Sequence, residues 1–399
     1  MPLADKLKEY KPKVKRTTPL WAGPNGSGEL GGVTQSMLGR FLVCRERFRI
    51  HYVEGLQPTR KWESRTGFGD MWHVCEEMLA GDPHSRSWEL GLQSYLEELL
   101  KKYPLQQEDI IKWYAICKTQ FPVYVDYWAK NPDVVARTPL MQEQKFDVKY
   151  TLPSGRCVRL RGKFDSVDLI DKHERFPKGI WLQENKTKGR VNEIQLKRQL
   201  SFDLQTMFYL IALHNEGWAG YESEGHFASD VPPHPILGVR YNVIRRDCPV
   251  VQHKDRQLKA GFKKGETQEE WCERLRRDYF AADPQEWFFR WKSEVTVEDV
   301  DKFRLECLDP VLENLLDDYE WWSWVAGDGK TWKEQPASVW ESKLRHTLFE
   351  HHQNRHYRHP FGIYNVLNEG GTDDVDQYLA DGSEVGLRRA ETMFEELQG

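Results

Sequence analysis

The sequence predicts an α/β fold in which a mixed central sheet is flanked by helices. Two observations carry this prediction. Segments of alternating apolar and polar residues, the pattern of half-buried strands, occupy much of 138–190 and return at 234–245 and 285–296. Segments with apolar residues at three- and four-residue spacing precede these strands and also lie between and after them. Strands and helices arranged in this order form sheets that helices cover.

The chain before the first strand is predicted to be a flexible arm followed by a helical wall. Residues 1–33 are polar, rich in proline and glycine and basic near the start, which is typical of a flexible basic arm and linker. This arm either contacts phosphates or is a solvated tail. Helical periodicity then predicts helices, with a break at Tyr103-Pro104, over residues 34–55, 67–80, 87–101 and 106–130.

The central strands are followed by a helix that packs on them. Period-two spacing predicts strands over 138–152 and 157–170, and a third strand carries Glu184 and Lys186. The helix predicted over 192–213 has Ile194 among its apolar residues. The remaining predicted elements are a strand over 234–245, a helix over 267–279, a strand over 285–296 and helices over 297–324 and 373–397.

These elements divide the chain into three parts. The flexible arm and linker occupy 1–33, and the main domain occupies 34–300, with its core at 138–247. A helical C-terminal extension follows over 301–399. A chain of 399 residues is long enough to bury a good core in one elaborated domain with such an appendage.

Composition and charge exclude several classes of protein. The formal net charge is −5, so no overall positive field attracts nucleic acid, and any attraction must come from local patches. Seven cysteines, an odd number without a CxxC pair, support neither a disulfide framework nor a zinc site. No apolar run approaches the length of a membrane span and no signal-peptide pattern is present, which predicts a soluble, cytoplasmic protein that makes no membrane contact.

Asp165, Glu184 and Lys186 form the clearest chemical pattern. Asp165 lies in the second predicted strand, and Glu184 follows it by 19 residues in the third. Antiparallel neighbours bring side chains of one face together, and Glu184 and Lys186, two residues apart, share a face. Carboxylates held together repel unless a divalent cation with oxygen ligands neutralises them. The pattern indicates a metal site for phosphodiester hydrolysis; the alternative is a half-buried hairpin with charged residues on its solvated face.

Several short motifs occur in a fixed order around this pattern. The chain reads GFGDMWH up to His73, GKFD up to Asp165, ENKT from Glu184, and QTMFY from Gln205 to Tyr209. This set, together with the helix over 34–56, resembles the PD-(D/E)xK nuclease superfamily in its RecB-type exonuclease branch. That branch typically has G-x-x-x-H, G-x-(I/V/F)-D, (D/E)-x-K-T and Q-x-x-x-Y in this order. The residue before the first acid is phenylalanine rather than the proline of the superfamily name, which this branch often lacks.

The resemblance implies a restriction-endonuclease-like fold with a Mg²⁺ or Mn²⁺ site. Its metal ligands would be His73, Asp165, Glu184 and the backbone carbonyl of Asn185. An imidazole ligand suits Mn²⁺ better than Mg²⁺. The alternative for His73 is an ordinary surface histidine. Some members carry an iron–sulfur cluster that needs three cysteines near the C-terminus; no cysteine follows Cys307, so no cluster is expected here.

The resemblance also implies roles around the metal. Lys186 would position the attacking water or stabilise the transition state. Gln205 and Tyr209, four residues apart on one helix face, would contact DNA or brace the metal ligands, and otherwise they form a polar helix face. Glu143 resembles the family's acid on the first strand. It either enters the site or binds a neighbouring arginine.

Basic residues near these motifs are candidates for nucleic-acid binding. The helix over 34–55 presents Arg40, and the loop over 245–264 is the best candidate for tracking phosphates. Each of these groups is otherwise a solvated charge, as charge runs usually are. The complete set of candidates is Arg40, Lys188, Arg190, Lys197, Arg198, Arg245 and Arg246.

The sequence therefore predicts a metal-dependent DNA nuclease, and the resemblance favours an exonuclease acting in DNA repair, recombination or phage DNA processing. Its substrate would be single-stranded DNA or duplex ends, and a helicase or recombination protein would be its partner because the chain has no motor motif. One alternative is a catalytically degenerate nucleic-acid-binding module of a repair complex. Another is a metal-independent scaffold within such a complex.

Overall fold

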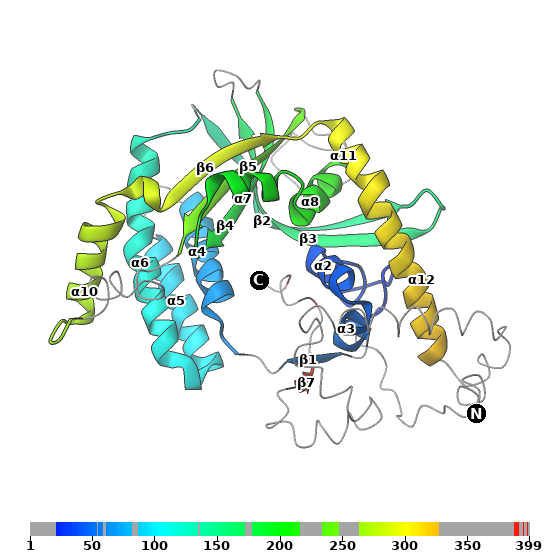
Figure 1. The fold of residues 1–399 in the computed structure, drawn as a ribbon, viewed down its shortest axis with the longest axis horizontal. Helices are drawn as coiled ribbons and strands as arrows, with labels where there is room; N and C mark the ends of the chain where they lie inside the picture. Colours follow the sequence, from blue (N-terminus) through cyan, green and yellow to red (C-terminus); the bar gives the residue numbers. More distant parts are fainter. Residues whose placement is uncertain are drawn as a thin grey trace.

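The computed structural model describes residues 21–53, 55–58, 61–81, 87–134, 136–171, 178–215, 234–246, 263–326, 387–390, 394 and 397. Within these residues a five-stranded mixed sheet has the strand order β2-β3-β4-β5-β6. Helices cover the sheet on both faces, each over its own buried cluster (Figure 1). The predicted α/β architecture, with a mixed central sheet flanked by helices, is confirmed.

The first three strands of this sheet form an antiparallel meander. They are β2 (Arg137–Thr151), β3 (Cys157–Ile170) and β4 (Gly179–Lys188). Cys157–Ile170 has the predicted bounds, because its alternation begins directly after a Pro-Ser-Gly turn. The meander places the predicted acids of β3 and β4 on neighbouring strands.

The remaining two strands extend the sheet with a change of direction. β5 (Ile236–Arg245) lies parallel to β4, and β6 (Phe288–Glu294) returns antiparallel to β5. A parallel step requires a crossover, which contains the helices α7 (Glu193–Leu200) and α8 (Leu204–His214). Nearly every residue of β5 is buried, polar ones included, because this strand lies inside the sheet with both faces covered.

One face of the sheet packs against α8 and against helices from both ends of the described chain. These are α2 (Gln35–Val43), α11 (Val297–Phe303) and α12 (Asp309–Ala326). Phe164 and Phe208 lie in their shared apolar cluster. The N-terminal segment therefore packs with the C-terminal helices on the side of the sheet that α8 covers.

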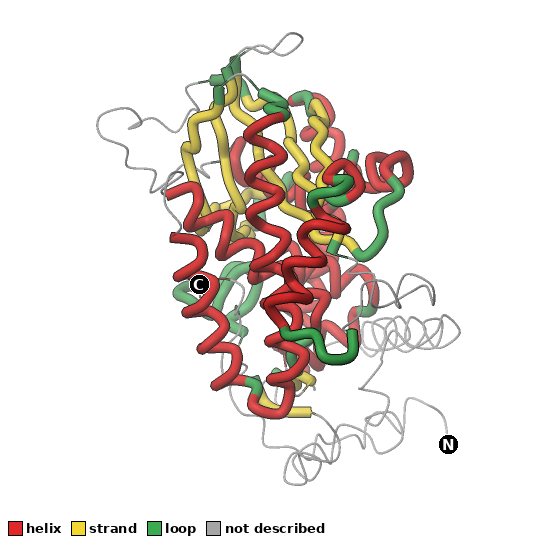
Figure 2. The backbone as a smooth tube through the Cα atoms, turned by 90° about the vertical axis from the view of Figure 1, so that its left-hand side faces the viewer, coloured by secondary structure: helices red, strands yellow, loops and turns green. Residues whose placement is uncertain are grey.

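The other face packs against a group of longer helices that contact one another. Their cluster includes the fully buried Trp72 and Phe121. Figure 2 shows the strands of the five-stranded sheet gathered at one end of the molecule, with long helices extending away from them. The helices of this group are α4 (Ser64–Gly81), α5 (Ser87–Lys102), α6 (Gln107–Lys130) and α10 (Gln268–Leu275).

Short elements connect these layers. The short helices include three π-helical segments, which can replace the last turn of an α-helix or join two helices. None of the described helices is both long and apolar enough to cross a membrane. The short elements are α3 (Arg45–Phe48), η1 (Arg49–Val53), η2 (Pro104–Gln106), η3 (Arg276–Phe280), η4 (Pro284–Glu286), η5 (Arg304–Leu308), β1 (Leu56–Pro58) and β7 (Leu387–Arg389).

Four predicted helices are interrupted in the structure. The helix over 34–55 breaks at Cys44, whose backbone is extended. The helices over 267–279 and 297–324 pass into the π-helical η3 and η5. The helix over 192–213 divides at 201–203, where the Asp203 side chain accepts a hydrogen bond from Thr206 N and caps α8. Ile194 does not pack on the sheet as predicted and is exposed. Apolar periodicity continues across such breaks, so the sequence does not reveal them.

The C-terminal end also differs from the prediction. The segment 373–397 was expected to be helical, but Leu387–Arg389 forms the strand β7, antiparallel to β1 near the start of the chain. A three-residue strand is too short to show a period-two pattern. Most of the basic arm and most of the basic loop over 245–264 lie outside the described residues.

Candidate metal centre

Asp165 is held at the point where β3 and β4 stop pairing. The pairing of β3 with β4 ends at Ser166 and Gln183. Asp165 precedes Ser166 and Glu184 follows Gln183, so the two acids are the next neighbours on adjacent strands. The backbone N–H of Asn185 donates a hydrogen bond to Asp165 Oδ2 over 2.8 Å. This bond fixes the carboxylate in the gap between the two strands and leaves Oδ1 for other partners.

Glu143 of β2 reaches the same place through a local change in backbone conformation. It has φ +48°, and among the described residues it is the only non-glycine with positive φ. Such a conformation costs of the order of 1–2 kcal/mol and often lies at functional sites. Strand alternation changes phase here, since Met141 and Phe146, five residues apart, are both buried. Glu143 Oε2 pairs with Lys163 Nζ at 2.7 Å, so its cationic partner on β3 is a lysine rather than an arginine.

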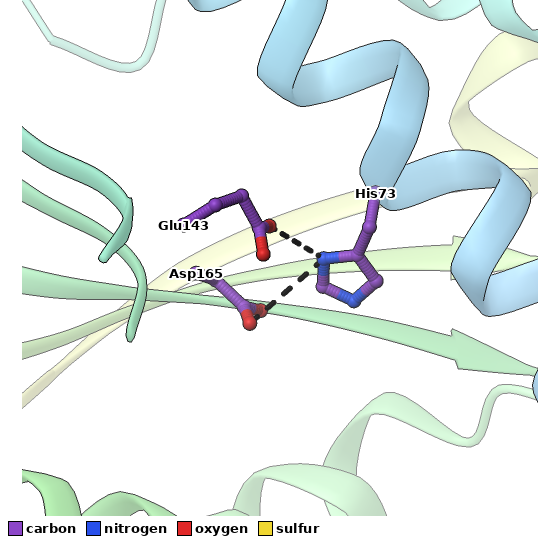
Figure 3. Close-up of side chains that lie close together, drawn as sticks. All are labelled: His73, Glu143 and Asp165. Carbon is purple, nitrogen blue, oxygen red and sulfur yellow. Dashed lines mark hydrogen bonds and ion pairs between the residues drawn. The ribbon is translucent and has the colours of Figure 1, made fainter. Parts of the chain in front are cut away.

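His73 joins these two carboxylates from the helix α4, and Figure 3 shows the three side chains converging. His73 Nδ1 lies 3.1 Å from Glu143 Oε1 and 3.8 Å from Asp165 Oδ1. One ligand atom from each of the three residues lies within 4.8 Å of the others. His73 is therefore not an isolated surface histidine.

The second half of the site contains Glu184, Lys186 and the helix α8. Lys186 Nζ donates to Glu184 Oε1 over 2.6 Å and to Gln205 Oε1 over 2.7 Å. Gln205 Nε2 in turn donates to Glu184 Oε1 over 2.7 Å and to the Tyr209 hydroxyl over 3.4 Å. The helix that carries the Q-x-x-x-Y motif is thus bonded directly to both strand residues of the E-x-K motif.

Burial and charge shift the pKa values of these groups strongly. Burial would lower the pKa of His73, but the charge of Asp165 and the hydrogen bond to Glu143 outweigh it and raise the pKa to about 10. Burial raises the pKa of Glu184 to about 8, against the attraction of Lys186. Burial also raises the pKa of Asp165. Without a cation, this site binds protons in its place.

The donor set fits a divalent cation. Glu184 is only 1% exposed, and its Oε2 is a buried carboxylate oxygen with no hydrogen-bond partner in the described part of the chain. An unpaired buried oxygen of this kind is costly unless an ion or a proton occupies it. The residues whose ligand atoms lie within 4.8 Å of one another are His73, Glu143 and Asp165, and they offer the nitrogen and oxygen ligands that Mg²⁺ or Mn²⁺ accepts. Glu184 is not in this group; its Oε2 is a further buried oxygen on the strand next to Asp165.

A buried polar network supports the site from behind. Asn242 of β5 donates to Asn185 Oδ1 over 2.9 Å and to the Tyr124 hydroxyl over 2.7 Å, and it lies 3.4 Å from Glu76 Oε1. Its own Oδ1 accepts a hydrogen bond from Arg290 Nε over 3.1 Å. Glu76 lies one turn after His73 on α4, so the network joins the helix of the histidine to β4, whose Asn185 N–H donates to Asp165.

The predicted nucleic-acid-binding residues near the site fall into two groups. Lys188, at the end of β4, accepts a backbone hydrogen bond from Arg246, and Arg246 Nη1 also donates to Ser64 O over 3.4 Å. Arg190 and Arg198 are exposed. Lys197 forms an ion pair of 2.6 Å with Glu193. Lys188, Arg190 and Arg246 lie at the end of β4, which carries the E-x-K motif, and Arg245 of the neighbouring β5 pairs with Lys188 there.

Two other candidates have aromatic partners. Arg40 Nη1 donates to the Tyr52 hydroxyl over 3.2 Å, with its guanidinium over the same ring. The Arg245 guanidinium lies 5.0 Å from the Trp287 ring centroid. Their roles in nucleic-acid binding remain predictions.

Lys163 is the partner that sequence reasoning missed. It lies on β3 two residues before Asp165, so the alternation that places Asp165 in the site also places Lys163 on its face. Its ion pair with Glu143 helps to hold that carboxylate beside His73. The two-residue spacing of Lys163 and Asp165 was therefore visible in the sequence. It indicated an ion pair only once the pairing of β3 with β2 brought Glu143 to Lys163.

A nuclease-type α/β sheet and a cluster of acids, histidine and lysine where β3 and β4 separate define the class of this protein. The family model of the PD-(D/E)XK nuclease superfamily matches residues 33–292, and the chain belongs to this superfamily. Its members are generally nucleases that hydrolyse phosphodiester bonds of DNA and typically use divalent metal ions. A comparison with curated proteins gave no match.

Proposed function

We propose that this protein is a Mg²⁺- or Mn²⁺-dependent exodeoxyribonuclease of the RecB-type branch. The observation that carries this proposal is the convergence of His73, Glu143 and Asp165, with ligand atoms within 4.8 Å, beside the paired Glu184 and Lys186. A binding-only module has no need for such a cluster, because three carboxylates without a cation repel a phosphate. Exonuclease action is favoured by the order of the motifs.

The proposed ligands are His73, Glu143, Asp165, Glu184 and the backbone carbonyl of Asn185. A divalent cation bound there would acidify a water molecule and offset negative charge on the scissile phosphate. Asn185 N–H holds Asp165 in position for this role. The strained backbone at Glu143 directs its carboxylate to the same place.

Lys186 is the proposed catalytic cation. Its ammonium group donates hydrogen bonds to Glu184 and Gln205 and is largely buried. Burial lowers the pKa of Lys186, but the charge of Glu184 outweighs burial and raises it, so Lys186 remains protonated beside the acids. From this position it would donate a hydrogen bond to the attacking water or to a phosphate oxygen. Gln205 and Tyr209 would hold Lys186 and Glu184 in place and orient the strand.

The substrate would be single-stranded DNA or duplex ends, contacted by basic residues that flank the strand ends. Candidates are Lys188, Arg190, Arg245 and Arg246 at the end of β4 and its neighbour β5, with Lys197 and Arg198 on α7 and Arg40 on α2. The setting would be DNA repair, recombination or phage DNA processing. A helicase or recombination protein would supply unwound strands.

The test is a cleavage assay on end-labelled single-stranded, linear duplex and circular DNA with Mg²⁺, Mn²⁺ or EDTA. We expect metal-dependent loss of linear but not circular DNA. Asp165→Asn and Lys186→Ala should lose cleavage while their circular dichroism spectra stay native. Arg277→Ala, an exposed charge on η3, is the matched control and should cut normally.

The outcomes separate the competing functions. Cleavage of circles would indicate an endonuclease with the same chemistry. Normal activity in either site variant would show that the ligand and lysine assignments are wrong. DNA binding without cleavage under any metal would favour a degenerate binding module instead.

A further inference from the structure

The helix α7 and the turn that follows it expose apolar side chains on the surface. Phe202, in the turn, is 55% exposed, and Ile194, in the first turn of α7, is 69% exposed. The same helix buries Leu196 and Leu200 on its opposite side. Phe202 lies in the short turn between the buried Leu200 and the start of α8, so its exposed ring is accessible to a ligand at this surface.

This turn lies beside the catalytic lysine. Asp203 directly follows Phe202, and its negative charge acts on both Lys186 and Lys188. Gln205, two residues further on, bonds to Lys186 and Glu184 at 2.7 Å. Phe202 is therefore anchored on one side to residues that contact the proposed reaction centre.

Positive charge accompanies the apolar side chains. Arg198 is exposed and lies four residues after Ile194, so both share the outer face of α7. Lys197 is already paired with Glu193, which leaves Arg198 as the better phosphate ligand on this helix. Arg190 is exposed just before the helix begins. Exposed aromatic and cationic side chains within a few residues of one another are the usual composition of a surface that binds single strands.

We propose that Phe202 and the outer face of α7 hold an unpaired segment of the DNA strand, with a base stacked on the Phe202 ring and a phosphate bound by Arg198. This inference rests on the proposed function, since the strand held is the one that the metal centre cuts. In a duplex the faces of the bases are covered by neighbouring bases, so a protein ring reaches them only in single strands or frayed ends. The surface therefore selects single-stranded DNA.

The test is the fluorescence anisotropy of a labelled oligo(dT) and of a duplex of the same length, in EDTA so that no strand is cut. Stacking on one aromatic ring is worth about tenfold in affinity, within a range of roughly five- to a hundredfold. Phe202→Ala should weaken binding of the single strand by about that factor and binding of the duplex less than twofold. Phe202→Trp should keep the affinity. Leu305→Ala, which removes an equally exposed apolar side chain from η5, should change neither.

Salt dependence separates stacking from charge. Phe202→Ala should shift the affinity equally at all salt concentrations, because stacking releases no counterions. Arg198→Ala should reduce the slope of log K against log salt by about 0.7 for a single strand. A 2-aminopurine base should be quenched by the native protein and by Phe202→Trp, but not by Phe202→Ala.

Two results would overturn the proposal. One is equal weakening of single-stranded and duplex binding by Phe202→Ala, and the other is unchanged binding of both. Neither depends on cleavage, so failure here is distinct from failure of the proposed nuclease function. Native protein that cuts DNA while Phe202→Ala binds normally would refute the stacking surface alone.

Discussion

Binding of a divalent cation should release about two protons from this protein at pH 7. The reason is that the metal-free site stores protons on groups that must lose them to become ligands. Glu184, with a pKa of about 8, and His73, with a pKa of about 10, are both mainly protonated at neutral pH. Metal ions and protons therefore compete for the same buried groups.

The magnitude follows from these two values. At pH 7 a group with a pKa of about 8 retains roughly nine tenths of its proton, and one with a pKa of about 10 retains nearly all of it. Asp165, whose pKa is also raised, can only add to this number. At pH 9 Glu184 retains only about a tenth of its proton, so the release should fall to about one, from His73.

Isothermal titration calorimetry with Mn²⁺ in two buffers of different ionisation enthalpy measures this release directly. The difference in observed enthalpy, divided by the difference in buffer enthalpy, is the number of protons per protein molecule. His73→Ala should lower that number by about one at both pH values, and Glu184→Gln should lower it by about one at pH 7 only. Arg277→Ala serves again as the control.

The reasoning would be refuted by Mn²⁺ binding with the same enthalpy in both buffers at pH 7. That result would mean that the cation binds elsewhere, or that His73 and Glu184 are not protonated in the metal-free protein. An unchanged proton number in His73→Ala would specifically remove the histidine from the ligand set.

Three further predictions concern the stability of the metal-free protein. Glu184→Gln should stabilise it at pH 9 in thermal unfolding. The raised pKa of Glu184 in the folded protein gives stability that is complete below about pH 4.5 and is lost as the pH rises through about 8. Equal melting temperatures of the variant and the native protein at pH 9 would contradict this. Asn242→Leu should lower the free energy of unfolding in urea by roughly 2–4 kcal/mol by leaving its buried partners unpaired, and a loss under 1 kcal/mol would argue against the network. Gly162→Ala should cost about 1–3 kcal/mol, since its methyl group would lie 2.4 Å from the Phe146 ring, and an unchanged urea midpoint would show that the ring moves freely.

The local sequence was sufficient to predict the main sheet and the pairing of the two acids. The alternation of Cys157–Ile170 begins directly after a Pro-Ser-Gly turn, so this strand could be predicted with its bounds. The spacing of Asp165 and Glu184 on adjacent strands and of Lys186 two residues on then follows from strand geometry. These features depend only on residues close in the chain.

Only the tertiary structure decided what surrounds those acids. His73 and Glu143 are 70 residues apart, and their contact depends on how α4 packs against β2 and β4. The direction of the Glu143 carboxylate depends on a positive φ that no sequence period signals. The exposure of Phe202 depends on a break between α7 and α8 inside a continuous apolar pattern. Periodicity reports which side of an element is apolar, whereas these three features depend on which other element lies against it.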